Sequence, residues 1–243
     1  MNPSIRQDDS ATSQRPAAGL ALGNPRFTDA RLARIAAEHG PAAAWRAALA
    51  EAGASAAAAA AVAAAVGGDF AVGLSDAGGH GLLAVDRFAM RTLCWRIVDG
   101  KLHFAERADE LAALAPRAEI DPQAIYDYLY FHVVPSPRTI FQGVHRLPPA
   151  HLAWFEDGRI TLLPYWTPRF EEPARGDFES LAGAFKQRLR EAVAAQLDGS
   201  KPACFLSGGT DSSTVAGMIG EVAGRAAATY SIGFEAEGYD EMQ

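Results

Sequence analysis

The stretch from Cys204 to Met218, CFLSGGTDSSTVAGM, restricts the fold of this chain more than any other part of the sequence. A short apolar run precedes its two glycines, and a run of helical composition follows them. This order predicts a strand, a tight loop and a helix. The run AATYSIGF comes next and predicts a second strand, so this part of the chain is expected to be a parallel α/β domain.

The loop SGGTDSS has the composition of a phosphate-binding site. Backbone N–H groups and the positive end of the helix dipole converge where a helix begins. Gly208 and Gly209 permit positive φ angles and let phosphate oxygens approach the backbone. Asp211 would repel a bare phosphate, so it fits best with a Mg²⁺ ion between the two charges. The hydroxyl donors of the loop are Ser207, Thr210, Ser212 and Ser213.

A plain strand-to-helix turn, with Asp211 or Ser212 as the helix N-cap, is the alternative interpretation of this loop. A Gly-Gly pair alone would favour that alternative. The complete pattern Ser-Gly-Gly-x-Asp-Ser favours a nucleotide site instead. It is not the Walker pattern, because no lysine follows the glycines.

The length and composition of the chain predict two domains. It has 243 residues, of which 49% are hydrophobic, so it can bury a substantial core. Residues 167–177, TPRFEEPARGD, are rich in proline, arginine and acids and predict a linker. We therefore expect a flexible polar leader at 1–22, a first domain at 23–170 and a second at 178–243.

Periodicity places helices and short strands before the linker. Helices are expected from a cap at Thr28 or Asp29, over the alanine-rich run 54–66, and from a cap at Asp121. The last two strands are expected to form a hairpin at Asp157-Gly158. The predicted strands are FAVGLSD, GLLAVD, TLCWRIVDG, KLHFAER, HLAWFED and RITLLPYW.

Charge and cysteine content exclude several classes of function. The net charge of −7, with no long basic block, argues against nucleic acid or an anionic membrane surface as partner. The alanine run is too short and too weakly hydrophobic to span a bilayer. Cys94 and Cys204 are isolated, which excludes a disulfide framework and a cysteine-rich metal site. These features predict a small-molecule partner and a cytoplasmic location.

Motifs spread along the chain resemble one known family. SGGTDSS after an apolar strand is similar to the pyrophosphate-binding loop of ATP pyrophosphatases, and the remaining motifs narrow the resemblance to asparagine synthetases. In family order these are GDFAVGLSD, LLAVDRFAMRTLCW, KLHFAER, TIFQGVHRLPPAH, PYW, and finally SIGF with YDE. The resemblance implies an Ntn-type glutamine amidotransferase domain, which is a four-layer α/β/β/α sandwich. The start of a parallel α/β synthetase domain of the ATP-pyrophosphatase (PP-loop) type would follow it.

The resemblance also implies an activity. In this family ATP adenylates a carboxylate with loss of pyrophosphate, and ammonia derived from glutamine attacks the acyl-adenylate. The implied cofactors are ATP and Mg²⁺, the carboxylate is aspartate or an analogue, and the nitrogen donor is ammonia or an amine; a homodimer is possible. Leu206 and Ile232 would flank the adenine, and Asp211 would help to bind Mg²⁺. The implied pyrophosphate contacts are Ser207, Gly208, Gly209, Thr210, Asp211 and Ser212.

The sequence departs from the family at the glutaminase nucleophile. Family members use a cysteine exposed as the new N-terminal residue, with its own α-amino group as base. This chain has Asn2, and a carboxamide offers no equivalent of a thiolate. Cys94 and Cys204 lie in predicted strands, and Gly23-Asn24-Pro25 resembles the family's Asn-Gly-Glu glutamine contact without its acid. We expect a retained fold without glutaminase activity, with Ser4 as a weak alternative nucleophile.

A second departure lies at the end of the sequence. The family's synthetase half continues well beyond YDE, whereas this sequence stops at Gln243. We therefore expect a fragment with an incomplete ATP site, in which no catalytic residue can be named. Asp240 and Glu241 either match the family's YDE or belong to a solvated acidic loop.

Two further interpretations of the function stay open. A lost glutaminase would leave free ammonia or an amine of the substrate as the nucleophile, and the second option resembles β-lactam synthetases and lasso-peptide cyclases. A non-catalytic scaffold is the other interpretation. Outside the motifs for ATP, Asp86 and Arg87 are expected to form an ion pair that fixes a strand turn.

Overall fold

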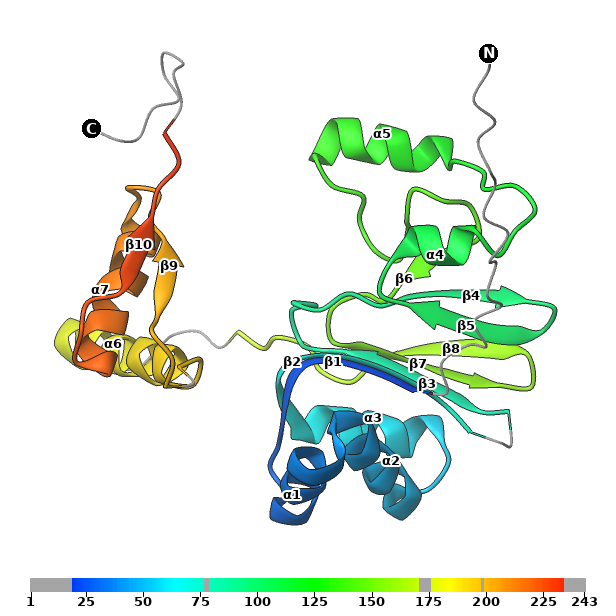
Figure 1. Ribbon diagram of the computed structural model, residues 1–243, viewed down its shortest axis with the longest axis horizontal. Coiled ribbons are helices and arrows are strands. Elements are labelled where there is room, and N and C mark those ends of the chain that lie inside the picture. Colours follow the sequence, from blue (N-terminus) through cyan, green and yellow to red (C-terminus); the bar gives the residue numbers. More distant parts are fainter. Residues whose placement is uncertain (1–18, 77–78, 171–175, 198, 234–243) are drawn as a thin grey trace, which may run out of the picture. The chain divides into compact units, whose positions relative to one another are not determined.

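The computed structural model describes residues 19–76, 79–170, 176–197 and 199–233 (Figure 1). The chain forms two compact units, which divide between Arg169 and Phe170. Within the described ranges, no helix is both long enough and apolar enough to cross a membrane.

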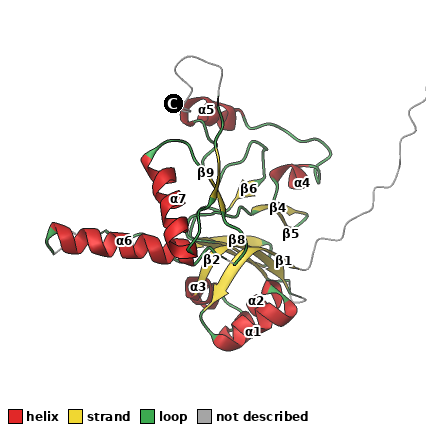
Figure 2. Ribbon diagram, turned by 60° about the vertical axis from the view of Figure 1, so that its left-hand side comes forward, coloured by secondary structure: helices red, strands yellow, loops and turns green. Residues whose placement is uncertain are grey.

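A layer of helices forms one face of the first unit (Figures 1 and 2). Its members are α1 (Ala30–His39), α2 (Pro41–Ala52) and α3 (Ala56–Ala65). The Asp29 carboxylate caps α1 by accepting the N–H groups of Arg31 and Leu32, and the Ser55 hydroxyl caps α3. Trp45 of α2 is completely buried, and its ring packs against the ring of Phe70. The other buried residues of these helices are alanines.

The helix layer covers a sheet of five antiparallel strands. In chain order they are β1 (Gly19–Phe27), β2 (Val66–Ser75), β3 (Gly81–Val85), β7 (His151–Glu156) and β8 (Arg159–Pro164), and the spatial order is β1-β2-β3-β7-β8. Asp157 and Gly158 form the turn between β7 and β8, with φ angles of 50° and 74°. This is the tight hairpin that the sequence predicts.

A second, smaller sheet packs on the other face of the first. Its strands are β4 (Cys94–Val98), β5 (Lys101–Ala105) and β6 (His145–Arg146), in the order β5-β4-β6. The two sheets approach closely because Gly73 and Gly81 carry no side chain. A Cβ atom at Gly73 would lie 2.5 Å from the Phe104 ring, and one at Gly81 would lie 2.6 Å from Leu102. Two residues of β5 thus rest directly on the backbone of the larger sheet.

Two more helices complete the first unit as a four-layer α/β/β/α sandwich of the Ntn type, as expected (Figure 1). They are α4 (Ala108–Ala112) and α5 (Pro122–Phe131). Asp121 caps α5, and Arg138 binds the carboxylates of Asp121 and Asp127 at 2.7 and 3.2 Å. The exposed apolar side chains of α5 are Ile125, Tyr126, Tyr128, Leu129, Tyr130 and Phe131.

The second unit has the order that the sequence predicts for a parallel α/β domain. Its elements are α6 (Phe178–Ala194), β9 (Ala203–Phe205), α7 (Thr210–Ala223) and β10 (Ala228–Tyr230). The strands β9 and β10 pair in parallel. The Asp177 carboxylate caps α6 by accepting the N–H of Ser180 at 2.8 Å.

The first strand corrects one expectation. Residues 19–22, which the sequence analysis places in the flexible leader, belong to β1 and pair with β2. Leu20 and Leu22 pack against the core between the two sheets, whereas Ala21 packs against the core beneath the helices. This alternation is the period-2 pattern of a strand, but small residues and a proline weaken it.

The role of Asp86 is a second correction. Asp86 is only 2% exposed, and the Arg87 guanidinium lies over the ring of Trp166 rather than on the Asp86 carboxylate. The carboxylate instead accepts backbone N–H groups. The donors are Phe70, Phe88, Met90 and Arg91, at 3.2, 2.9, 3.2 and 3.2 Å. Asp86 does fix the turn after β3, but it acts through the backbone, because a buried carboxylate needs several donors.

Candidate functional site

The glycine-rich loop joins the carboxyl end of β9 to the start of α7. Leu206 extends β9 by donating its N–H to the Tyr230 carbonyl at 2.9 Å, and the Ser231 hydroxyl donates to the Leu206 carbonyl at 2.7 Å. Ile232 follows directly and is 67% exposed. The structure thus brings Leu206 and Ile232 to the same end of the strand pair, where ligands bind in open α/β sheets.

The two glycines of the loop have different roles. Gly208 has a φ of 84°, which favours glycine. Gly209 is the N-cap of α7, with an ordinary φ of −75°, and it provides no capping side chain. The alternative interpretation is therefore wrong in placing the N-cap at Asp211 or Ser212. The first N–H groups of α7 have no side-chain acceptor at the cap, and such groups are the usual anion ligands at a helix start.

Hydroxyl groups hold the loop in shape. The Ser207 N–H donates to the Ser212 hydroxyl at 3.2 Å, and the two serine hydroxyls lie 3.0 Å apart. The Ser212 hydroxyl also donates to the Gly209 carbonyl at 3.3 Å. Thr210 accepts a bond from Thr214 through its carbonyl, at 2.7 Å. The loop residues Ser207 to Asp211 and Ser213 are all exposed, so the loop is open to a ligand.

Asp211 is the acidic residue of the loop that could hold a cation. It lies in the first turn of α7 and is exposed, and no described residue forms a hydrogen bond or ion pair with its carboxylate. In the part of the chain that the structure describes, no group of three or more histidine, cysteine or acidic residues could hold a metal ion. Mg²⁺ commonly binds through one or two carboxylates, with phosphate oxygens and water as its other ligands, and Asp211 fits that pattern.

A second polar cluster lies at the Gly23-Asn24-Pro25 stretch, which resembles a glutamine contact. Gly23, Asn24 and Pro25 belong to β1. The Asn24 amide donates to Asp69 of β2 at 3.3 Å, and Arg91 Nε binds the other oxygen of the same carboxylate at 2.9 Å. Burial alone would raise the pKa of Asp69, but the bonds from Arg91 and Asn24 outweigh it and hold that pKa below its usual value.

The sequence did not predict that Asp69 and Arg91 would join Asn24 in this polar cluster. The available signal was an acid directly after two glycines, in GGDF.

The two cysteines are not placed as nucleophiles. Burial raises the pKa of Cys94, in β4, to about 11, so its thiol stays protonated at neutral pH. Cys204 lies in β9 and is half-buried. Four candidate site residues lie outside the residues that the structure describes, namely Asn2, Ser4, Asp240 and Glu241.

Comparison with known proteins supplies the decisive observation. The glutamine amidotransferase domain model matches residues 50–166, and the asparagine synthase model matches residues 184–243. The two models occur in the order found in asparagine synthetases. The chain is similar to asparagine synthetases along both of its units.

Curated relatives show the same similarity. The amidase chyE of Penicillium rubens is 35% identical over 162 residues, which cover 64% of this chain and 24% of the relative. Asparagine synthetase [glutamine-hydrolyzing] 1 of Bacillus subtilis is 28% identical over 161 residues, or 65% of this chain and 25% of the relative. A putative asparagine synthetase of Methanocaldococcus jannaschii is 33% identical over 129 residues, or 51% and 25%. The match spans about a quarter of each relative's length.

Among solved structures, the glutamine phosphoribosylpyrophosphate amidotransferase of B. subtilis, complexed with ADP and GMP, matches with a TM-score of 0.36 and 11% identity. The match covers 88% of this chain and 45% of that chain.

Proposed function

We propose that this chain supplies the pyrophosphate-binding part of an ATP-dependent ligase. The ligase activates a carboxylate as an acyl-adenylate, releases pyrophosphate and transfers the acyl group to ammonia or an amine. The observation that carries the proposal is the open SGGTDSS loop at the carboxyl end of β9, with Gly209 as a helix N-cap that has no capping side chain. The carboxylate is aspartate or an analogue.

Different residues in and beside the loop would bind the pyrophosphate, the Mg²⁺ ion and the adenine of ATP. The N–H groups at the start of α7, together with the hydroxyls of Ser207 and Ser212, would donate to pyrophosphate oxygens. A Mg²⁺ ion on Asp211 would neutralise negative charge on the departing pyrophosphate. Leu206 and Ile232 would contact the adenine through their apolar side chains, because both lie at the strand ends next to the loop.

The nitrogen donor of the proposed ligase differs from the glutamine that the family resemblance implies. We infer that the first unit keeps its sandwich fold without glutaminase activity, so the nucleophile is free ammonia or an amine of the substrate. Two observations support this. The Cys94 thiol is buried with a raised pKa, and the carboxylate of Asp69 is already bound by Arg91 and Asn24. An internal amine, as in β-lactam synthetases and lasso-peptide cyclases, is the second candidate because it also needs no glutaminase.

The test is ATP–pyrophosphate exchange by the complete gene product with a panel of carboxylates, in the presence of Mg²⁺. We expect exchange with one class of carboxylate and no release of glutamate from glutamine. The variant Asp211→Asn should lower the exchange rate at least tenfold. Asp157→Asn, in the turn between β7 and β8, is the matched control and should leave the rate unchanged.

Product analysis then identifies the acceptor. Asparagine formed from aspartate and ammonia supports the first candidate, whereas a cyclised product supports the internal amine. Absence of exchange with every carboxylate, together with no binding of pyrophosphate and Mg²⁺, would reject the ligase and favour a scaffold. Glutamate release would reject the loss of glutaminase.

A further inference from the structure

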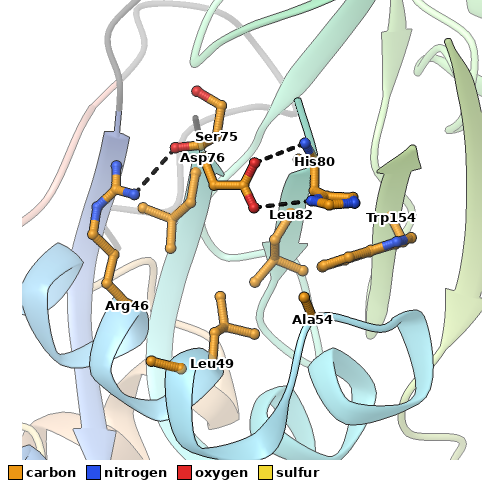
Figure 3. A pocket seen from close by; sticks show the side chains of 11 residues that line it. Arg46, Leu49, Ala54, Ser75, Asp76, His80, Leu82 and Trp154 are labelled. Carbon is orange, nitrogen blue, oxygen red and sulfur yellow. Dashed lines mark hydrogen bonds and ion pairs between the residues drawn. The ribbon is translucent and has the colours of Figure 1, made fainter. Parts of the chain in front are cut away.

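A cavity of about 320 Å³ lies in the first unit, between the helix layer and the larger sheet (Figure 3). Its walls are mostly apolar: Leu49 comes from α2, Leu82 from β3 and the indole of Trp154 from β7. Small residues leave it unfilled, because Ala50 at the end of α2 and Ala54 in the following turn are too short to reach across. The cavity therefore offers apolar surface beside an aromatic ring.

The polar groups at its mouth already have partners. His80 Nδ1 lies 3.0 Å from the Asp76 carboxylate, and Nε2 lies 3.2 Å from Glu156. The imidazole stacks on Trp154, with ring centroids 5.8 Å apart and planes 22° apart. Arg46 donates to the Ser75 carbonyl at 3.1 Å, as Figure 3 shows.

Polar groups of both signs lie at the mouth, and the protein already provides their partners. The basic groups are Arg46 and His80, and the acidic groups are Asp76 and Glu156, both of which His80 contacts. A charged ligand would lose its hydration on entering an apolar cavity, and a mouth whose polar groups already have partners gives little attraction in return. Charge complementarity thus selects an uncharged ligand.

We propose that this cavity binds an uncharged aromatic molecule of about bicyclic size, with its flat face against Trp154. An apolar cavity of about 150 Å³ accepts benzene, so roughly twice that volume suits two fused rings. Aromatic rings gain from offset or edge-to-face contact with an indole. The site lies in the first unit and does not depend on the proposed ligase activity of the second.

The probe for the test is 1-aminonaphthalene, which is uncharged at pH 7. Titration of the full chain, followed by probe fluorescence and by amide shifts of Leu74 and Leu82, should give saturable binding with a dissociation constant on the order of 0.1–1 mM. The charged relatives 1-naphthoate and 1-naphthylmethylammonium should bind at least tenfold more weakly. Equal binding of either ion would overturn the neutral site.

Cavity-filling variants locate the site. Ala54 is exposed at the cavity rim, so Ala54→Phe should fill the cavity without unfolding the chain and should weaken probe binding at least tenfold. Ala50→Leu fills it from α2 and should act in the same direction. Ala57→Phe, at an exposed position of α3 outside the cavity, is the control and should bind as the wild type does. Unchanged binding in both filling variants, or no saturable binding by the wild type, would refute the proposal.

Discussion

Arg91 Nε lies 2.9 Å from the carboxylate of Asp69, which also accepts the Asn24 amide at 3.3 Å. The three residues come from β1, from β2 and from the segment after β3, so one carboxylate joins three separate parts of the chain. Asn24 belongs to the Gly23-Asn24-Pro25 stretch, which resembles the family's glutamine contact. An acid that is held by an internal cation is less available to bind the ammonium group of a free amino acid.

Asp69 should therefore contribute to stability in a pH-dependent way. Its pKa is lowered below the ordinary value of 3.8 in the folded state. The stabilisation is thus complete above 3.8 and is lost as pH falls through the lower folded value. Asp69→Asn should cost about 0.5–1 kcal/mol at pH 7 and progressively less below pH 4. Urea unfolding at several pH values measures this, and a cost that does not change with pH would contradict it.

His80 should show the opposite dependence. The hydrogen bond to Asp76, aided by the charge of Glu156, raises the pKa of His80 above 6.5. Its stabilising contribution is complete below 6.5 and is lost as pH rises through the higher folded value. Asp76→Asn should move the pKa of His80 back toward 6.5, as measured by an NMR titration of its ring protons. A titration that is identical in the variant and the wild type would show that Asp76 has no such role.

Asp86 should be the most sensitive polar residue of the first unit. Asp86→Ala removes the acceptor of four backbone N–H groups and should cost about 3 kcal/mol or more in the free energy of unfolding. Arg87→Ala removes only the contact over Trp166 and should cost about 1 kcal/mol or less. Comparison of the two by urea denaturation distinguishes the backbone role from the expected ion pair, which would make both losses similar.

Gly73 tests the close approach of the two sheets. In Gly73→Ala the new methyl group meets the Phe104 ring, which should cost about 1–3 kcal/mol through overpacking. Adding Phe104→Leu to that variant should recover part of the loss. Gly67→Ala, in the same strand and without a close neighbour, is the control. If Phe104→Leu gives no recovery, the steric explanation fails.

Gly209 separates binding from folding in the candidate ATP site. Its φ of −75° suits alanine, and a Cβ there would approach only the Ser207 hydroxyl, at 3.6 Å. Gly209→Ala should therefore cost at most about 1 kcal/mol of stability, yet it should weaken pyrophosphate binding at least tenfold because a methyl group would obstruct the approach of phosphate oxygens to the backbone. Calorimetric titration with pyrophosphate and Mg²⁺ measures the effect. Unaltered affinity would remove the loop from the proposed site.

Much of the fold is predictable because its strongest signals are local. Asp29 and Asp121 cap their helices, Asp157-Gly158 forms the predicted hairpin turn, and the strand–loop–helix–strand order around SGGTDSS follows from apolar runs broken by glycine. The roles of ATP, Mg²⁺ and the acceptor carboxylate remain predictions that the binding and exchange experiments address.

Features that depend on distant contacts are not predictable in this way. The Asp69–Arg91 pair joins two segments whose proximity follows only from the sheet topology. Asp86 is recognisable as a turn residue, but its backbone partners include Phe70 on a neighbouring strand. The two-residue strand β6 has too few residues to give any periodic signal.

The attachment of the helix layer depends heavily on one side chain. Trp45 is its one large buried group among residues that are otherwise alanine, and α1 has no buried residue at all. Methyl groups interlock poorly, so they give the helices little resistance to sliding over the sheet. Leu49 and Val62 are only partly buried against the same core, so the Trp45 indole is the largest of the few side chains that hold the layer on the sheet. Loss of the indole would therefore loosen the helix layer before the two sheets.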